Sequence, residues 1–290
     1  MSSLPAFSLL LPVYHGDDPQ FLGEAFRSAV HDQVLKPDEV VLVQDGPVGD
    51  ALSAAIRLVV ASSPVPVNHV VLEENRGLAT ALTRGLDACE FDVVARMDAD
   101  DIALPERFDV QIPLIASGFD LVGSALSEFT VGADGVEQIL GKRTPPLSAE
   151  NIRLTLPFRA PFNHPTVVYR RECVAAAGGY LPMGQMEDYW LFGRMITAGV
   201  KAMNVSDALV KYRVSSGAYA RRGGIRLLTS EVALQRAFRQ EGITTRTQFL
   251  RNVLLRGGYR LIPEFIRKRA YRGVFVSRNP RDGQAKQNSQ

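Results

Sequence analysis

The first hundred residues alternate short apolar runs with helical periodicity, and this alternation restricts the fold of the chain more than any other feature. Four runs rich in Val and Leu have the composition of strands buried on both faces: residues 7–13, 39–44, 65–72 and 92–97. Apolar residues from Phe21 to Val30 share one helical face between the first two runs, and Leu78 begins a similar face before the fourth. This order predicts an α/β protein with right-handed crossovers and an open, mostly parallel sheet flanked by helices.

Ligands of such sheets bind at the carboxyl ends of the strands, so candidate site residues are expected there. After residue 100 the sequence no longer alternates strand and helix patterns regularly. The further expected elements are a helix over 105–117 that Pro113 kinks or shortens, strands over 120–130 and 136–140 around a turn, a loop over 156–165, and a helix over 188–198 that ends at Gly199.

Composition excludes collagenous, disordered and disulfide-framework proteins. With 46% hydrophobic and 22% charged residues the chain is an ordinary globular protein, and its net charge of +2 gives no reason to expect a nucleic-acid partner. Cys89 and Cys173 are far apart, without CxxC spacing, and are expected to be reduced thiols. The longest stretch without Asp, Glu, Lys or Arg covers residues 1–16, which is too short for a spanning helix. Because no basic region precedes it, we expect a cytoplasmic protein.

Two common nucleotide-binding signatures are absent. Tyr14 and His15 follow the first strand where a GxGxxG fingerprint would stand. Residues 135–143 are similar to a Walker loop, but they have one residue too many between the glycines and Arg143 in place of Ser or Thr. We therefore interpret this segment as a turn.

Three carboxylates directly follow the fourth apolar run, where Asp98, Asp100 and Asp101 surround Ala99. Carboxylates this close repel one another unless a cation joins them, and hard oxygen ligands suit Mg²⁺ or Mn²⁺. The alternative is that Asp100 or Asp101 only caps a helix beginning near Pro105. The cluster alone favours neither interpretation.

A second acidic pair, Glu187 and Asp188, stands at the start of the helix expected over 188–198. Acids at a helix N-terminus ordinarily serve as caps and dipole partners. Only the surrounding pattern gives this pair another interpretation.

Taken together, these residues resemble the family 2 glycosyltransferases, which have the GT-A nucleotide-sugar-binding fold, over residues 7–215. Five segments carry the resemblance in the family's order: Pro12, Val13 and Tyr14; Asp45 and Gly46; Asn75 to Gly85; the D-x-D motif Asp98 to Asp100; and the ED motif Glu187 and Asp188. Residues 163–171 and 211–213 are similar to elements of the bacterial exopolysaccharide, capsule and amylovoran-biosynthesis transferases. Gln44 and Pro47 depart from the family's base-binding turn, and Trp190 stands where many relatives carry an acid.

The resemblance implies an inverting transferase that moves a hexose from a nucleotide diphosphate sugar, UDP-linked in our interpretation, to a saccharide or lipid-linked acceptor. Asp100, with Asp98 or Asp101, would hold Mg²⁺ or Mn²⁺, and Asp188 beside Glu187 would be the general base. The donor-binding residues implied are Pro12, Val13, Tyr14, Asp45, Asn75, Gly77, Arg84, Asp98, Ala99 and Asp100. The physical chemistry agrees, because a divalent ion stabilises a diphosphate leaving group and a carboxylate can accept the acceptor's proton.

Five assignments have plain structural alternatives. Tyr14 either stacks on the base or covers the sheet end, and Arg84 either meets the diphosphate or pairs with a surface acid. His164 is either a contact for the acceptor or phosphate or an ordinary loop histidine. Arg213 is a candidate phosphate contact, and Trp190 is either core or acceptor wall.

The domain prediction places a glycosyltransferase domain at 1–215, with a nucleotide-sugar half at 1–125 and an acceptor half at 126–215. A basic helical extension with a disordered tail follows at 216–290. Residues 246–281 contain ten Arg and Lys against Glu264 alone, a net charge of +9. With the apolar residues Leu261, Ile262, Phe265 and Ile266, this segment either binds an anionic membrane surface or packs on the catalytic domain.

Two other functions compete with sugar transfer. A sugar nucleotidyltransferase also holds a metal with clustered acids, but it has no required role for Glu187 and Asp188. A non-catalytic nucleotide-sugar or polysaccharide-binding subunit would keep the sheet and bind without turnover.

Overall fold

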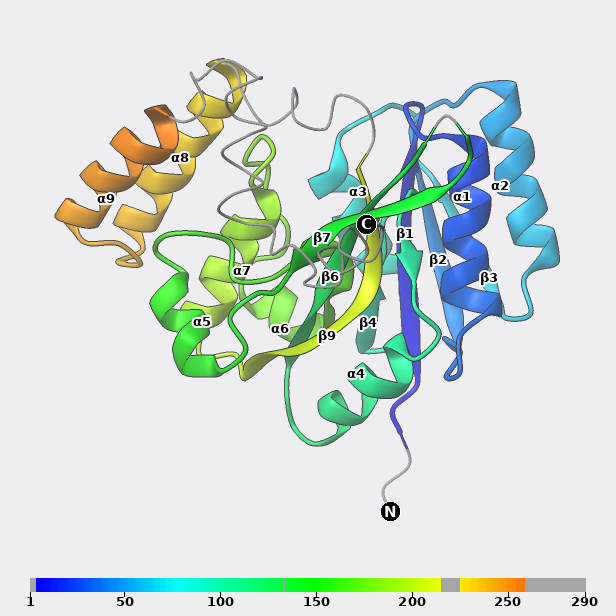
Figure 1. The fold of residues 1–290 in the computed structure, drawn as a ribbon, viewed down its shortest axis with the longest axis horizontal. Helices are drawn as coiled ribbons and strands as arrows, with labels where there is room; N and C mark the ends of the chain where they lie inside the picture. The colour runs from blue at the N-terminus through cyan, green and yellow to red at the C-terminus, as the bar shows by residue number, and fades with distance from the viewer. Residues whose placement is uncertain (1–3, 133, 215–224, 259–290) are drawn as a thin grey trace, which may run out of the picture.

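The computed structural model describes residues 4–132, 134–214 and 225–258. Its nine described strands form one sheet whose order begins at the edge strand β3 (Figure 1). That order is β3 (Val67–Val71), β2 (Glu39–Asp45), β1 (Phe7–Tyr14), β4 (Val93–Arg96), β8 (Val168–Arg170), β6 (Leu121–Val131), β9 (Ala202–Arg213) and β5 (Ile102–Ala103), with β7 (Glu137–Arg143) paired to β6.

The first four strands in this order are parallel, as the alternating pattern predicts. Tyr14 pairs with Asp45 in register, and the short strand β4 runs beside the first half of β1. The carboxyl ends of β1, β2 and β4 therefore open on the same edge of the sheet. Beyond β4 the sheet is mixed, because β8 is antiparallel to both β4 and β6 while β9 is parallel to β6.

Helices cover both faces of the sheet. Leu9 and Leu11 of β1 belong to the core under α1 (Pro19–Phe26), α2 (Asp50–Ser62) and α4 (Arg107–Ala116). Leu10, on the opposite face, belongs to the core under α3 (Leu78–Ala88) and α7 (Glu187–Thr197). This alternation is the period of two that a strand buried on both faces requires. The short helices α5 (Ala149–Thr155) and α6 (Arg171–Ala176) complete the second face.

Several sequence predictions are confirmed, and others need correction. Gly199 has φ of +87° directly after α7, and the turn near 132–135 joins β6 to β7. Pro113 lies inside α4 without breaking it, although the helix is shorter than the predicted 105–117. The expected loop over 156–165 contains a short 3₁₀ turn, His164–Thr166. The prediction that residues 65–72 are buried on both faces was wrong: β3 is the edge strand, and His69 and Val71 are exposed.

Two α-helices lie in the described residues 225–258, after β9. α8 (Ile225–Gln240) and α9 (Arg246–Asn252) lie side by side at the opposite end of the molecule from α2 (Figure 1). Phe238 of α8 is fully buried, and its ring centroid lies 4.9 Å from that of Tyr189 in α7. The described part of the extension thus shares the core of the preceding domain. The domain boundary at 215 stays a prediction, and the tail predicted to be disordered lies outside the described residues.

Candidate active site

The segment after β4 gathers the carboxylates that the sequence singled out. Asp98, Asp100 and Asp101 each offer an oxygen atom, and these atoms lie within 4.8 Å of one another. Asp98 and Asp100 are partly exposed, while Asp101 is fully buried. The strand end therefore presents an acidic cluster to the edge where β1 and β2 also end.

Strand β9 fixes the backbone of this cluster. The Arg213 N–H donates to Asp101 Oδ1 at 2.9 Å, and Arg213 Nε donates to the Asp100 carbonyl at 2.9 Å. Nη2 of the same guanidinium donates to Glu24 Oε2 at 2.6 Å, and the group lies 3.9 Å from the ring centroid of Phe21. In this arrangement Arg213 supports the Asp100 backbone, and its predicted phosphate contact stays untested.

Burial and mutual repulsion raise the pKa values of these acids. The pKa of Asp100 rises to about 6, first because of burial and then because of the neighbouring Asp98 charge. Asp101 has a pKa well above its ordinary value for the same two reasons. Asp17, in the loop after β1, has a pKa of about 7, mainly from burial, with added repulsion from Asp100 and Asp98. The sequence reading missed Asp17 because nothing local relates that loop to β4.

The cluster fits a divalent cation of the Mg²⁺ or Mn²⁺ class. All of its donors are carboxylate oxygens, the ligand type these ions prefer. Asp101 Oδ2 is buried and has no hydrogen-bond partner, so one oxygen in the cluster is left unsatisfied. The alternative that Asp100 or Asp101 is merely a helix cap is wrong, because the residue at the N-cap of α4 is Glu106 and no side chain caps that helix.

A buried arginine that the sequence reading did not consider lies at the centre of the site. Arg96, the last residue of β4, is 1% exposed, and its guanidinium binds both carboxylate oxygens of Asp98. Burial raises the pKa of Glu187 and of Asp188, and the Arg96 charge offsets part of that rise for both carboxyl groups. A signal was available, because an arginine inside an apolar run that is buried on both faces needs an acidic partner.

The ED pair lies at the first turn of α7, at this same site. Burial raises the pKa of Glu187 to about 7, and its Oε2 is buried without a hydrogen-bond partner. The pKa of Asp188 is also raised by burial, and the Asp98 charge adds to that effect. Asp188 is the more exposed of the two acids. The fold thus brings together two acidic motifs that are about ninety residues apart in the chain.

His164 and Trp190 are both buried. His164 Nε2 lies 2.9 Å from the Tyr180 hydroxyl, and burial, with the nearby Arg96 charge, holds the pKa of the imidazole well below its ordinary value. His164 is therefore neutral near pH 7. Trp190 packs against Phe238 of α8, and the Arg194 guanidinium lies 4.9 Å from its ring centroid. Of the two interpretations of Trp190, the core position is the one observed.

At the end of β2, Asp45 holds the loop that leads into α3. Asp45 Oδ1 and Oδ2 accept the N–H groups of Arg76 and Gly77 at 2.8 and 2.9 Å. Gly46 has φ of +84°, and a Cβ atom there would lie 2.4 Å from the Asn75 nitrogen. Only glycine fits this close approach of two loops. Asp45 thus positions the predicted donor loop, and its contact with a base stays a prediction.

The other predicted donor residues differ in accessibility. Tyr14 is 44% exposed at the end of β1 and is open to stacking, whereas Pro12, Val13 and Ala99 are buried in the strand ends. Asn75 and Arg84 are exposed. Arg84 lines a groove of about 550 Å³ between β3 and α3 that includes none of the clustered acids. The predicted contact of Arg84 with the diphosphate stays a prediction.

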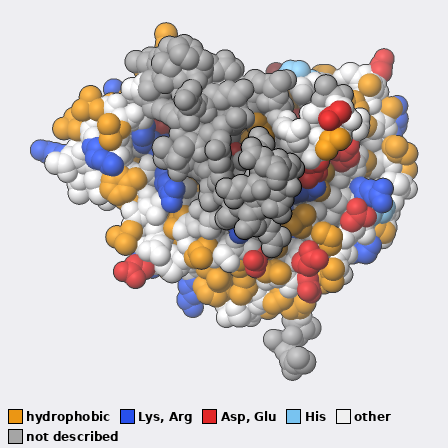
Figure 2. Space-filling model, in the orientation of Figure 1, with side chains coloured by type: hydrophobic (Ala, Val, Ile, Leu, Met, Phe, Trp, Pro, Cys, Tyr) orange, Lys and Arg blue, Asp and Glu red, His pale blue; other side chains and the backbone are white. Residues whose placement is uncertain are grey.

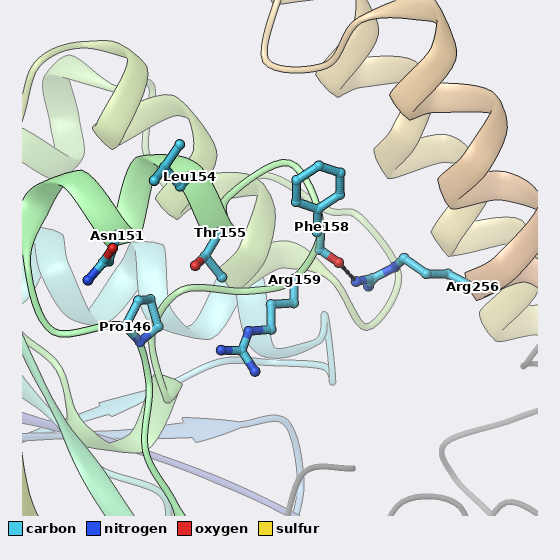
Figure 3. Close-up of a pocket in the computed structure, with 7 residues that line it drawn as sticks. All are labelled: Pro146, Asn151, Leu154, Thr155, Phe158, Arg159 and Arg256. Carbon is cyan, nitrogen blue, oxygen red and sulfur yellow. Dashed lines mark hydrogen bonds between the residues drawn. The ribbon is translucent and has the colours of Figure 1, made fainter.

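A second hollow, of about 530 Å³, lies away from these acids, between α5, the loop that follows it and Arg256 (Figure 3). Arg256 donates to the Phe158 carbonyl and to both carboxylate oxygens of the fully buried Glu231. Its donors are thus used to join the helical extension to the loop.

Comparisons with known proteins agree with this geometry. The family model described as glycosyl transferase family 2 matches residues 8–174. The chain is 39% identical over 261 residues to the amylovoran biosynthesis glycosyltransferase AmsE of Erwinia amylovora, covering 89% of this chain and 94% of that protein. It is 32% identical over 273 residues to an Escherichia coli UDP-Gal:alpha-D-GlcNAc-diphosphoundecaprenol beta-1,3-galactosyltransferase, covering 93% and 97%.

Solved structures share the fold at lower identity. The S. aureus TarS 1-349 complex with UDP-GlcNAc has a TM-score of 0.64 at 19% identity, covering 87% of this chain and 72% of that one. The mannosyltransferase PcManGT from Pyrobaculum calidifontis, in complex with GDP-Man and Mn²⁺, has a TM-score of 0.64 at 17% identity, covering 95% and 77%. The predicted GT-A fold is thereby confirmed, and the chain belongs to glycosyl transferase family 2.

Proposed function

We propose that this glycosyltransferase transfers a hexose from a UDP-sugar, with inversion, to a saccharide or lipid-linked acceptor of a bacterial cell-surface polysaccharide. The proposal rests on the closeness of two acidic motifs, the D-x-D motif after β4 and the ED motif at the start of α7. The charges of Arg96 and Asp98 both act on the pKa of the Asp188 carboxyl group. A nucleotidyltransferase needs acids on a metal but has no use for the second motif. The names of the relatives, which include a UDP-Gal donor and a diphosphoundecaprenol acceptor, support the donor and acceptor classes.

The cluster after β4 would hold the divalent ion, with Asp100 as its principal ligand. When bound, Mg²⁺ or Mn²⁺ stabilises the negative charge that the nucleoside diphosphate acquires as the glycosidic bond breaks. The chain's own contribution is to fix the Asp100 backbone through Arg213, so that the carboxylate keeps its position at the strand end. Bound Mn²⁺ in one structural neighbour supports this choice of ion class.

Asp188 is the better candidate for the general base. A base must reach the acceptor hydroxyl, and Asp188 is partly exposed, whereas Glu187 is 8% exposed. The Arg96 charge favours the ionised form of Asp188, which is the form that accepts a proton. Proton removal and attack on the face opposite the leaving group give a single displacement, and a single displacement inverts the anomeric carbon.

The decisive test is a panel of nucleotide sugars and acceptors, assayed for nucleotide release with Mn²⁺ and with EDTA. Asp188→Asn should bind donor but lose about a hundredfold to ten-thousandfold in turnover, which is the usual effect of losing a general base. Asp109→Asn, which changes an exposed carboxylate on α4, is the matched control and should keep wild-type turnover. Near-normal Asp188→Asn with inactive Glu187→Gln would identify Glu187 as the base. Donor binding without turnover by the wild type would favour a non-catalytic subunit.

We also propose that the helical extension meets the inner face of the cytoplasmic membrane, where a lipid-linked acceptor would lie. Leu250, Leu254 and Leu255 are 59%, 73% and 62% exposed, and Arg251 lies among them. Figure 2 shows hydrophobic and basic side chains together over α9. Exposed leucines beside basic residues suit an anionic interface, where each basic residue contributes about 1 kcal/mol. The residues from Leu261 to Ile266 that suggested this contact lie outside the described part of the chain.

No helix within 4–132, 134–214 and 225–258 is long and apolar enough to cross a membrane. Peripheral binding is tested by co-sedimentation with anionic vesicles at low salt. Leu254→Ser should reduce the bound fraction, and Leu58→Ser, at a leucine 69% exposed on α2, should not. Wild-type protein that stays in the supernatant would refute the membrane contact and leave the transfer reaction untouched.

A further inference from the structure

Arg96 and Asp98 form the best-buried ion pair of the candidate site. Arg96 Nη1 donates to Asp98 Oδ2 at 2.7 Å, and Nη2 donates to Oδ1 in the parallel, two-point geometry. The Arg96 side chain is 1% exposed and that of Asp98 is 27% exposed. A planar guanidinium that holds both oxygens fixes the plane of a carboxylate as well as its place.

The other two acids of the cluster are held differently. Asp101 uses Oδ1 to accept the Arg213 N–H, and its Oδ2 has no hydrogen-bond partner. Asp100 is held through its main-chain carbonyl, by Arg213 Nε. Asp98 is therefore the one acid of the three whose two carboxylate oxygens are both bound by a guanidinium.

We propose that Arg96 is a positioning residue that withdraws Asp98 from the metal and leaves the ion to Asp100 and Asp101. The inference rests on the metal-dependent transfer proposed above and assigns different roles to the three acids. A cation that approached Asp98 would have to displace a buried guanidinium or lie beside it, and both are unfavourable. The Arg96 charge also acts on Asp100 and Asp101. However, Asp101 Oδ2 has no hydrogen-bond partner, and Arg213 binds Asp100 through its main-chain carbonyl.

Arg107 is a matched control for Arg96. It is the first residue of α4, is 0% exposed, and donates from Nη2 to the Arg96 carbonyl at the end of β4 at 2.6 Å. Its other contacts are Met97 Sδ at 3.0 Å and Gln111 Oε1 at 3.2 Å, so it binds none of the three acids. A lysine at either position keeps a positive charge but loses the planar fork.

The test titrates the full chain with Mn²⁺ alone and follows free Mn²⁺ by electron paramagnetic resonance, with thermal unfolding as the check on folding. The double variant Arg96→Gln with Asp98→Asn, which removes both charges of the ion pair, should change the Mn²⁺ Kd by less than about twofold, and Asp100→Asn should weaken it at least about tenfold. Arg96→Lys should bind Mn²⁺ severalfold more tightly, because it frees an Asp98 oxygen. Arg107→Lys should leave the Kd unchanged.

Equal losses in this double variant and in Asp100→Asn, or a wild-type Kd in Arg96→Lys, would overturn the inference and leave the transfer reaction standing. If Arg96→Lys does not fold, the double variant Arg96→Gln with Asp98→Asn decides. It removes both charges, and a wild-type Mn²⁺ Kd is expected, whereas a tenfold loss would make Asp98 a ligand. A wild-type chain that binds no Mn²⁺ would refute this inference together with the metal part of the proposed function.

Discussion

Replacing Arg213 by methionine distinguishes a support for the Asp100 backbone from a phosphate contact. The substitution keeps an unbranched apolar chain between Phe21 and Phe129 but removes the guanidinium. It leaves the Asp100 carbonyl without its 2.9 Å donor and Glu24 without its 2.6 Å partner. If Arg213 served only to bind phosphate, the ligand-free protein would lose little.

The expected loss of stability is about 3 kcal/mol. A hydrogen bond from a charged donor contributes about 1.5 to 3 kcal/mol, and the stacked guanidinium adds about 1 kcal/mol. The ion pair with Glu24 adds almost nothing to the free energy of unfolding, because the Glu24 side chain is 39% exposed and screened by water. At an unfolding entropy of about 2.1 cal/mol/K per residue, this chain should lose about 5 °C in Tm.

The assay is thermal unfolding of the ligand-free protein, followed by calorimetric titration with UDP and Mn²⁺. Arg57→Met, which removes an exposed arginine that donates to the Ser53 hydroxyl, should stay within about 1 °C of the wild type. An unchanged Tm in Arg213→Met, combined with weaker UDP binding, would show that Arg213 binds phosphate and that the backbone contact is unimportant.

Two more substitutions test the neighbouring loops. Gly46→Ala should lower both Tm and UDP affinity, because a Cβ atom at this φ of +84° would lie 2.4 Å from the Asn75 nitrogen. Gly49→Ala is the control, because a Cβ atom there has open space around it. Wild-type Tm and UDP affinity in Gly46→Ala would refute the close approach. The pKa of Asp17 is raised from 3.8 to about 7, so the folded protein binds a proton at this residue more tightly than the unfolded chain does. The contribution of this proton to the free energy of unfolding is complete below pH 3.8 and is lost as the pH rises through 7. Asp17→Asn should therefore raise the Tm, measured with EDTA, at pH 8 more than at pH 4, and an equal change at both would contradict the assigned burial.

The parallel half of the sheet was predictable because its signals are local. Each strand from β1 to β4 is an apolar run in the sequence. Parallel strands of this kind need connecting helices, which cover the two faces of the sheet. The exposure of β3 was not predictable, because its sequence is apolar enough for the interior and only the strand order makes it an edge. Strand order depends on contacts between distant segments, which the pattern within a run does not contain.

The site shows the same division between local and distant information. The acids at 98–101 and 187–188 stand out by spacing, and the structure brings both sets together. The contacts of those acids were not predictable: Asp17, from the loop after β1, is a further acid close to the cluster. Arg213 stands out in the sequence as a candidate phosphate contact, but its hydrogen bonds to Asp100 and Asp101, more than a hundred residues earlier, do not. The sequence around Trp190 does not distinguish core from acceptor wall, because the residue that packs on its ring, Phe238, lies in α8.

Two arginines from different strands, β4 and β9, explain how so many acids can be placed at a sheet edge. Arg96 neutralises a side chain, Asp98, while Arg213 holds the main chain of Asp100 and the carboxylate of Asp101. Buried carboxylates without such contacts would take up protons or move apart. Burial and the Asp98 charge raise the pKa of Asp100 to about 6, and the charges of Arg96 and Arg213 limit that rise, so the carboxyl group is mostly ionised at neutral pH. A preorganised, ionised carboxylate of this kind is ready to bind a cation without moving, and that is the condition for efficient electrostatic stabilisation of a leaving group.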